Sequence, residues 1–198
     1  MELLKATPDK FYDLAIVDPP YGIGMGGGKV GNSKVDYKQF AGADKKAPED
    51  NYFYELNRIS ENMIIWGGNY FNLPPTPCFI CWDKVQPETF TMAMVEFAWT
   101  SFKSPAKIYK QRIVGADIDR IHPTQKPVKL YEWLLTNYAK QGDKILDTHV
   151  GSASSIIACL DMGFEYMGFE IDEEYYNSAS KRIEDAMNQV SFFNLGIM

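Results

Sequence analysis

The feature that most constrains the fold is a short apolar run that ends in two consecutive prolines. The run Leu14-Ala15-Ile16-Val17 is followed directly by Asp18-Pro19-Pro20-Tyr21. Four apolar residues, two of them β-branched, are typical of a buried strand, and proline cannot continue the hydrogen-bond ladder of a sheet. The second proline also restricts the first to extended geometry. The sequence therefore predicts a buried strand that stops at a rigid corner.

This corner carries groups that suit a planar amino compound. Ligands of open α/β sheets bind beyond the carboxyl ends of strands, where such a corner lies. Asp18 offers a carboxylate and Pro19 a free backbone carbonyl, so the two can accept two N–H bonds, while Tyr21 offers an aromatic face for stacking. Taken alone, the same residues more often form an ordinary turn that ends a strand.

Length and composition favour one globular domain over residues 1–198, of which 45% are hydrophobic and 23% charged. No apolar run is long enough to span a membrane, and the N-terminus lacks a signal-peptide pattern. We therefore expect a cytoplasmic protein without a membrane partner. Cys78 and Cys81 have C-x-x-C spacing, but no second pair of ligands accompanies them, so no metal site is expected.

The formal net charge of −6 argues mildly against nucleic acid, since duplex binding rests on neutralising phosphates. The distribution of charge argues the other way. Residues 22–48 and 101–130 are rich in Lys and Arg, whereas residues 161–185 are strongly acidic. A basic middle and an acidic end fit a molecule with one nucleic-acid face. An unevenly charged but solvated surface explains the same pattern.

Apolar periodicity predicts the remaining elements. We expect helices at about 48–62 and 128–140, a helix that follows a small-residue turn at 148–155 and ends at about 162, and a helix from 172 onward. Strands are expected at 63–66, 78–82, 94–102, 144–147 and 165–170. Pro127 suits a first helical position and Gly163 a C-terminal cap. Five glycines between Gly22 and Gly28 open a mobile loop, predicted over 22–48, which is either a lid over the site or a plain connector. The strand at 94–102 contains an unexpected acid, Glu96.

The block from Lys144 to Glu170 reads as strand, small-residue turn, helix and a strand that ends in an acid. This is half of a Rossmann-like nucleotide site. Gly151 and Ser152 let a ligand approach the backbone, and Glu170 can accept hydrogen bonds from both hydroxyls of a ribose. Because no cradle for a triphosphate is present, a ribose-containing ligand such as S-adenosylmethionine fits better. An ordinary βαβ turn is the alternative.

Together, Asp18-Pro-Pro-Tyr, His122-Pro-Thr-Gln-Lys-Pro and Asp147-x-x-x-Gly-Ser resemble the motifs of the DNA amino-methyltransferases, which methylate adenine N6 or cytosine N4. The order, with the catalytic motif before the cofactor motif, resembles the β group of that family and its compact phage-like forms. The resemblance covers most of the chain. It implies a Rossmann-like α/β fold with a mostly parallel sheet covered by helices on both faces, S-adenosylmethionine as cofactor, and double-stranded DNA as substrate.

The resemblance also implies the site residues. Asp18, Pro19, Pro20 and Tyr21 are the catalytic candidates. Asp147, Gly151, Ser152 and Glu170 are expected to hold the cofactor. The wider set of cofactor-binding candidates is His122, Thr124, Gln125, Lys126, Pro127, Asp147, Thr148, His149, Gly151, Ser152, Ala153, Glu170 and Ile171, in which Thr124, Lys126 and Pro127 cover the methionine side.

The chain departs from the family pattern at the cofactor turn, where the usual Asp-Pro-Phe-x-Gly-Ser-Gly has Thr148, His149 and Ala153 in place of Pro, Phe and Gly. The His149 ring can substitute for the aromatic contact. A usual upstream strand ending in Asn-x-Asp-Cys is not found. No stretch is long enough for a large target-recognition domain, so only residues 22–48 and the basic residues 101–120 could contribute one, and residues 101–120 are the expected minimal region. A homodimer and a separate specificity partner are both left open.

The expected reaction is transfer of a methyl group from S-adenosylmethionine to the exocyclic amine of a flipped base. Hydrogen bonds from the amine to Asp18 and the Pro19 carbonyl localise its lone pair toward the methyl group. Aspartate at the first motif position favours adenine N6 in family terms. Cytosine N4, RNA or a protein amide as substrate, and a degenerate module that binds without catalysis, are the alternatives.

Overall fold

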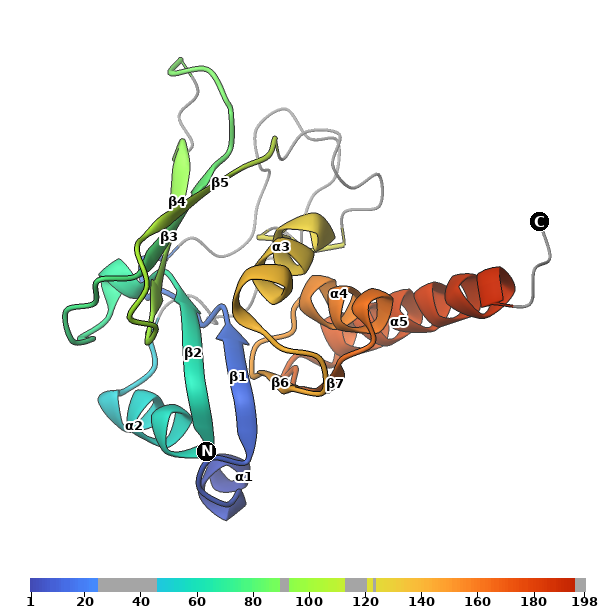
Figure 1. The fold of residues 1–198 in the computed structure, drawn as a ribbon, viewed down its shortest axis with the longest axis horizontal. Coiled ribbons are helices and arrows are strands. Elements are labelled where there is room, and N and C mark those ends of the chain that lie inside the picture. Colours follow the sequence, from blue (N-terminus) through green and yellow to red (C-terminus); the bar gives the residue numbers. More distant parts are fainter. Residues whose placement is uncertain (25–45, 90–92, 113–120, 123, 195–198) are drawn as a thin grey trace.

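The computed structural model describes residues 1–24, 46–89, 93–112, 121–122 and 124–194. In these residues seven strands form one sheet in the order β5-β3-β4-β2-β1-β6-β7 (Figure 1). The strands are β1 (Tyr12–Val17), β2 (Ser60–Trp66), β3 (Phe79–Asp83), β4 (Val95–Thr100), β5 (Lys107–Lys110), β6 (Lys144–Asp147) and β7 (Glu165–Gly168). The helices are α1 (Glu2–Ala6), α2 (Asp50–Ile59), the 3-10 turn η1 (Gly68–Tyr70), α3 (Val128–Tyr138), α4 (Ser154–Met162) and α5 (Glu173–Asn194).

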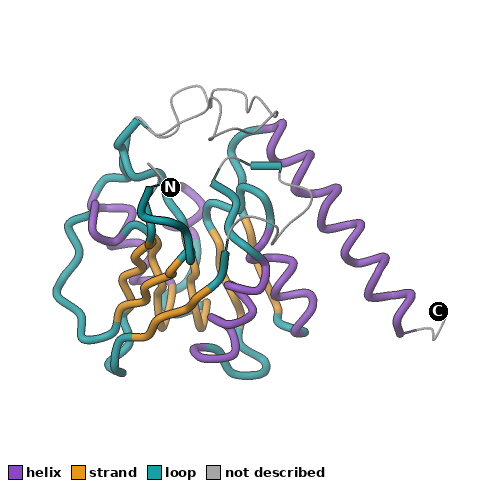
Figure 2. The backbone as a smooth tube through the Cα atoms, turned by 90° about the horizontal axis from the view of Figure 1, so that it is seen from above, coloured by secondary structure: helices purple, strands orange, loops and turns teal. Residues whose placement is uncertain are grey.

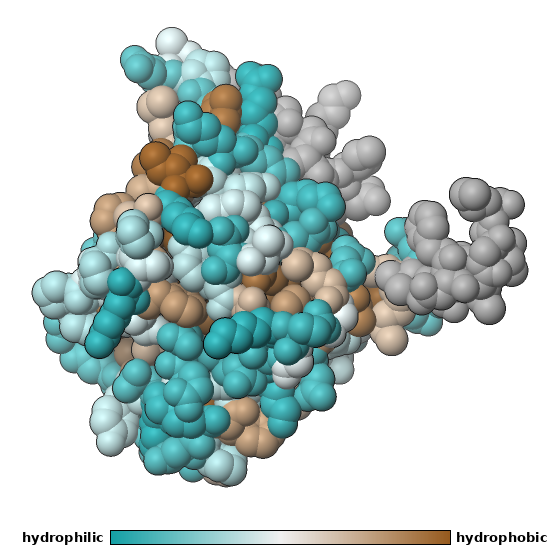
Figure 3. All heavy atoms as spheres, viewed as in Figure 1, coloured by the Kyte–Doolittle hydropathy of each residue, from teal (hydrophilic) through white to brown (hydrophobic). Residues whose placement is uncertain are grey.

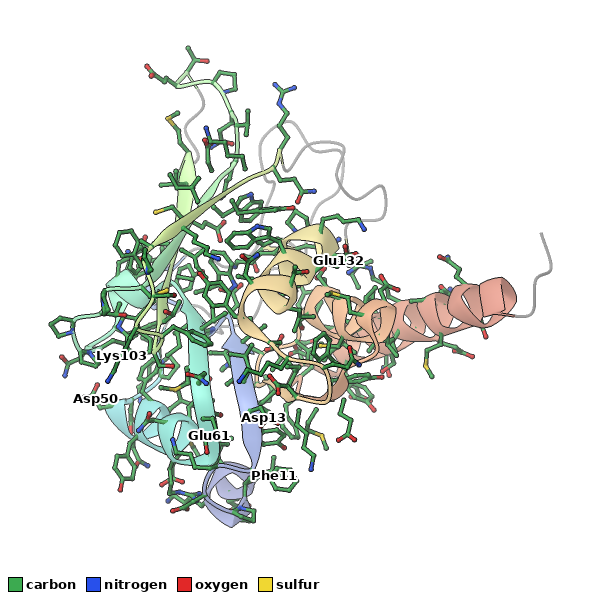
Figure 4. All side chains as sticks on the ribbon, in the orientation of Figure 1. Phe11, Asp13, Asp50, Glu61, Lys103 and Glu132 are labelled. Atoms are coloured by element: carbon green, nitrogen blue, oxygen red, sulfur yellow. The ribbon has the colours of Figure 1, made fainter. Side chains whose placement is uncertain are left out.

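Six of these strands run in one direction and β4 runs in the other. β1 pairs in parallel with β2 and β6, β6 with β7, and β3 with β5, whereas β4 is antiparallel to both β2 and β3. The expected mostly parallel sheet is therefore confirmed. The carboxyl ends of six strands and the start of β4 meet at one edge, which we call the catalytic edge because the family resemblance places the catalytic motif there. Asp13 and Glu61, labelled in Figure 4, lie near the amino-terminal ends of β1 and β2, at the opposite edge.

Both faces of β1 are buried, which explains why its sequence is continuously apolar. Because successive side chains alternate between faces, Leu14 and Ile16 belong to the core with Leu130 of α3, and Ala15 and Val17 belong to the core with Leu56 of α2. Figure 2 shows the strands at the middle of the body and α5 leading away from it. None of the described helices is long and apolar enough to cross a membrane.

Helix α5 docks on α4 through a small apolar cluster. Ala179 of α5 is buried with Ala153 and Ile156, and Ile183 packs against them. The rest of this 22-residue helix continues beyond the sheet (Figure 1). The first turn of α4 is therefore held between the sheet and α5, which fixes the turn that follows β6.

The predicted helix over 48–62 ends too late. It stops at Ile59, because residues 60–62 already pair with β1, in the register Tyr12↔Ser60 and Leu14↔Asn62. Pro127 is the residue before α3 rather than its first helical residue, with ψ at 142°. Gly163 caps α4 with φ at +72°, as expected. Most of the loop predicted over 22–48 lies outside the described residues.

Candidate active site

The predicted corner stands at the catalytic edge, directly after β1. The Asp18 carboxylate is held from two sides. Its Oδ1 accepts a hydrogen bond of 2.7 Å from the Tyr21 hydroxyl, and its Oδ2 accepts one from Lys126 Nζ. The side chain of Asp18 is 16% exposed. The carboxylate is thus fixed in direction and still reachable.

Tyr21 is fixed in turn by the chain that follows β2. Its ring stacks on Tyr70 with a centroid distance of 5.0 Å and an interplanar angle of 17°. Gly67, with φ at +67°, lies so close that a Cβ there would come within 2.2 Å of the Tyr21 ring. Burial and, after it, the charge of Asp18 raise the pKa of Tyr21, so its hydroxyl remains a donor to that carboxylate.

Lys126 occupies a buried position between two acids. Its ammonium lies 3.1 Å from Glu96 Oε2 in addition to its bond with Asp18, and Glu96 Oε1 lies 2.6 Å from Lys84 Nζ. The ammonium also lies 5.1 Å from the ring centroid of Trp66. Lys84, Glu96, Lys126 and Asp18 therefore form a row of alternating charges, which we call the charge row.

All members of this row whose pKa is shifted are held in the charged form. Burial lowers the pKa of Lys126, but the charges of Asp18 and Glu96 outweigh that effect and the net pKa is raised. Burial raises the pKa of Glu96, but Lys126 and Lys84 outweigh it and the net pKa is lowered. The mutual attraction of the charges thus compensates for their removal from water.

Sequence reasoning did not assign a role to Glu96 or Lys84. The signal for Glu96 was present, since an acid within an apolar strand stood out. Its position follows from the antiparallel course of β4, whose residues Trp99 and Ala98 pair with Ile65 and Trp66 and carry Glu96 past the end of β2. Nothing in the sequence near Lys84 indicated that it would be buried, at 6% exposure.

The second part of the site begins where β6 ends, at Asp147. Asp147 Oδ2 accepts a hydrogen bond of 2.5 Å from Ser155 Oγ, and Oδ1 accepts one of 2.9 Å from the backbone N–H of His149. Burial raises the pKa of Asp147 to about 7, although both of these hydrogen bonds oppose the shift. A buried carboxyl with this pKa favours a cationic partner.

Glu170 closes the turn from the end of β7. Its Oε2 accepts a bond of 2.8 Å from the Gly151 N–H, and its Oε1 accepts one of 2.9 Å from the Asp172 N–H. Each carboxylate oxygen has a further lone pair, so Glu170 can still accept hydroxyl donors. The next residue, Ile171, is 96% exposed and leaves an apolar surface beside that carboxylate.

The residues of the turn that differ from the family pattern have defined structural roles. Ala153, buried, has φ at +63°, a left-handed conformation that usually requires glycine. Thr148 Oγ1 lies 2.6 Å from the Tyr52 hydroxyl and 2.9 Å from His149 Nδ1. Burial lowers the pKa of His149 to about 4, so its ring is neutral. The His149 ring meets Tyr52 edge to face, as the phenylalanine of the family pattern could.

The segment before α3 joins the two parts. The His122 ring packs edge to face on Tyr175, with centroids 4.4 Å apart, and would lie 3.7 Å from a Cβ on Gly151. Thr124 Oγ1 lies 3.0 Å from His122 Nδ1, and Gln125, buried, accepts a bond from the N–H of Ile121 through its Oε1. Pro127 is buried at the start of α3. Lys126, four residues after His122, donates a hydrogen bond to Asp18.

The three motifs are therefore neighbours in space. β1 and β6 are adjacent, with Ala15 opposite Leu146, so the residues after these strands share the catalytic edge. His122 lies against Gly151 and Lys126 is bonded to Asp18, so the segment before α3 links the corner after β1 to the turn after β6.

Comparison with known proteins agrees with this arrangement. A family model for N6/N4 methyltransferases, described as DNA methylase, matches residues 65–181. The chain is 40% identical to the type II methyltransferase M2.DpnII of Streptococcus pneumoniae, over 92% of this chain and 85% of that protein. It is 36% identical to the type II methyltransferase M.HpaI of Haemophilus parainfluenzae, over 95% of this chain and 73% of that protein.

Solved structures share the fold at lower identity. The S-adenosylmethionine complex of M1.HpyAVI has a TM-score of 0.60 at 20% identity and covers 91% of this chain and 94% of its own. The cytosine-N4-specific PvuII DNA methyltransferase has a TM-score of 0.60 at 13% identity and covers 96% of this chain and 89% of its own. The expected Rossmann-like methyltransferase fold is thereby confirmed. With a family model that matches more than half of its length, the chain belongs to the N6/N4 DNA methylase family and is a DNA amino-methyltransferase.

Proposed function

We propose that this DNA amino-methyltransferase methylates adenine N6 in a base flipped out of double-stranded DNA. The observation that supports it most is the fixed Asp18 carboxylate at the end of β1, beside the turn that follows β6. In family terms, aspartate at this motif position favours adenine over cytosine. The family match and the type II methyltransferase relatives support a role in restriction-modification.

The methyl donor is S-adenosylmethionine, which supplies an electrophilic methyl group on a sulfonium; the complex of the structurally similar M1.HpyAVI supports this. The donor set at the turn fits such a molecule. Asp147 is a buried acid that favours a cation, Glu170 has lone pairs for ribose hydroxyls, and Ile171 offers an apolar face. Gly151, Ser152, Thr148, His149 and Ala153 shape the turn, and His122 and Thr124 lie against it.

The residues of the corner act on the amine of the target base. Asp18 and the Pro19 carbonyl accept its two N–H bonds, which draws the nitrogen lone pair out of conjugation with the ring. Pro20 and Tyr21 hold the corner in place, and Tyr21 does so through its bond to Asp18 and its packing on Gly67. Alignment and preorganised electrostatics supply most of the acceleration in a displacement of this kind.

Recognition of DNA is assigned to a small part of the chain. We propose that residues 1–198 act as one catalytic domain and that residues 101–120 are its minimal recognition region. Lys103, Lys107 and Lys110 of this region are exposed, as phosphate contacts require. The alignment with M2.DpnII extends over 230 positions, more than this chain contains, so that relative has segments without a counterpart here. We propose that a homodimer or a specificity partner completes the recognition of DNA.

One experiment tests the reaction and the target base together. The protein is incubated with duplex DNA and S-adenosylmethionine that carries a labelled methyl group, and the DNA is digested to nucleosides for mass spectrometry. Label in N6-methyladenine supports the proposal. Label in N4-methylcytosine overturns the choice of adenine, and labelled RNA or peptide with unlabelled DNA overturns the substrate. Calorimetric titration without detectable cofactor binding would identify a degenerate module instead.

A further inference from the structure

The charge row contains one acceptor that is not satisfied. Glu96 Oε2 is buried and accepts no well-directed hydrogen bond, although Lys126 Nζ lies 3.1 Å away. The other Glu96 oxygen is engaged by Lys84 at 2.6 Å. Buried carboxylate oxygens without a directed donor are rare, and each calls for an explanation. Here the explanation is that the Lys126 ammonium lies near both Asp18 and Glu96 but donates its hydrogen bond to Asp18.

The acid at which it is directed is the catalytic one. Lys126 donates to Asp18 Oδ2, and Tyr21 donates to Asp18 Oδ1, so each carboxylate oxygen already has a protein donor. A target amine must bring its own N–H to this carboxylate. A cation on the same oxygen weakens the carboxylate as an acceptor, because the cation withdraws the negative charge that the N–H needs.

Resting on the function proposed above, we propose that Lys126 and Glu96 are positioning residues for Asp18. While no base is bound, Lys126 holds Asp18 in its catalytic direction. When the target amine donates to Asp18 Oδ2, the ammonium turns to Glu96 Oε2, which lies within hydrogen-bond distance and has a free lone pair. No proton is transferred in this step, and no bond forms or breaks other than hydrogen bonds.

Lys84 and Trp66 hold the Glu96 carboxylate and the Lys126 ammonium in place during this change of partner. Lys84, 6% exposed, anchors Glu96 Oε1 so that Oε2 stays directed at Lys126. The Trp66 ring supports the ammonium from a centroid distance of 5.1 Å. Lys126 itself is 3% exposed, so its ammonium has little contact with solvent and Glu96 is the acceptor at hand.

This role differs measurably from the one that the sequence resemblance implies for Lys126, which is to cover the methionine side of the cofactor. We compare Lys126→Gln and Glu96→Gln with Lys129→Gln and Glu132→Gln. The control pair is a Lys–Glu pair at 2.7 Å on α3, in which Lys129 is exposed, Glu132 is partly buried and neither residue belongs to the charge row; Glu132 is labelled in Figure 4. Thermal melting shows whether each variant folds.

For both variants of the charge row we expect kcat at saturating DNA and cofactor to fall by about tenfold or more, as expected for a lost charged hydrogen bond. The dissociation constant for S-adenosylmethionine, measured by calorimetry, should stay within about twofold. The double variant should lose less than the product of the two single losses. Weaker cofactor binding with unchanged kcat would overturn the proposal, as would a Glu96→Gln variant that matches the controls.

A second measurement does not depend on methyl transfer. The side-chain carboxyl carbon of Glu96 is titrated by NMR in the wild type and in Lys126→Gln. Since Lys126 is the largest of the influences that lower the pKa of Glu96, we expect this carboxyl to titrate at higher pH in the variant. An unchanged titration would overturn the link between the two residues. A wild type that methylates no DNA overturns the proposed function, and the titration then decides on the charge row alone.

Discussion

The ammonium of Lys126 is hydrogen-bonded to the carboxylate of Asp18, although 108 positions of sequence separate the two residues. This bond joins the motif that ends β1 to the segment that begins α3. Both residues approach the catalytic edge because the first helical turn of α3 starts there, while β1 ends there. The bond brings two separate sequence motifs together in one candidate site.

Replacement of the catalytic carboxylate should separate chemistry from cofactor binding. Asp18→Ala is expected to lower methyl transfer by about 100-fold or more, as the loss of a preorganised electrostatic contact does. S-adenosylmethionine binding should change little, because the turn after β6 holds its residues through other bonds. A filter assay of labelled methyl groups on DNA measures the rate of methyl transfer, and calorimetry measures the binding of S-adenosylmethionine. Turnover retained in this variant contradicts the role of Asp18.

The close approach of Gly67 to Tyr21 should make this glycine irreplaceable. In Gly67→Ala the new Cβ would lie 2.2 Å from the Tyr21 ring and the backbone would keep φ at +67°. We expect a loss of about 3 kcal/mol in the free energy of unfolding, from backbone strain and overpacking together, and a reduced kcat because Tyr21 is displaced.

The matched control for this change is Gly142→Ala. Gly142 has φ at +92°, but nothing lies within 4 Å of the place that a Cβ would take there, so only the backbone strain remains. Its loss should be about 1 kcal/mol. Denaturant unfolding measures both variants, and equal losses would show that the contact with Tyr21 has no energetic weight.

Cofactor affinity should depend on pH through Asp147. Burial raises the pKa of this carboxyl to about 7, so it is largely protonated at pH 6 and ionised at pH 8. A cationic ligand prefers the ionised form and releases a proton when it binds below that pKa. The dissociation constant for S-adenosylmethionine should therefore be about tenfold higher at pH 6 than at pH 8. Calorimetry in buffers of different ionisation enthalpy measures the released proton, and Asp147→Asn should abolish the dependence.

His149 should lower acid stability. Burial lowers its pKa to about 4, whereas an unfolded chain protonates this ring near its usual value of 6.5. Between these values the unfolded state binds a proton that the folded state does not, so the free energy of unfolding falls as the pH drops from 6.5 to 4. His149→Phe should show a shallower decline over this window and keep its activity. A decline as steep as that of the wild type would contradict a neutral His149.

The exposed apolar residues around the β3–β4 connection offer a test of DNA binding. Brown atoms gather where these strands project from the body in Figure 3, and Val85, Met94 and Val95 are the exposed apolar residues there. They adjoin the catalytic edge through Lys84 of the charge row. We expect Met94→Asp to raise KM for DNA several-fold, since a carboxylate repels the phosphates. Thr7→Asp at the opposite edge of the sheet is the control. Equal KM values for DNA in Met94→Asp and Thr7→Asp would show that DNA does not bind at the β3–β4 connection.

Much of the fold follows from local sequence. The apolar runs Leu14–Val17 and Ile145–Leu146 located β1 and β6, because a strand that is buried on both faces requires consecutive apolar residues. Gly163 marked the end of α4, since only a left-handed residue completes that cap. The strand β5 was not predicted. Its residues Lys-Ile-Tyr-Lys are largely exposed at the edge of the sheet and carry no burial signal.

The sequence by itself determined which chemical groups the candidate site contains, since Asp18, Asp147 and Glu170 each lie at or just after the end of a strand that its apolar residues predict. Only the tertiary structure decided which groups meet. From the sequence, Lys126 is part of a cofactor segment and Glu96 is an unexpected acid within a strand. In the structure the antiparallel β4 brings Glu96 to Lys126, and Lys126 in turn is bonded to Asp18. The physical reason is that periodicity encodes burial, a property of neighbouring residues, whereas the pairing of buried charges depends on strand order across the sheet.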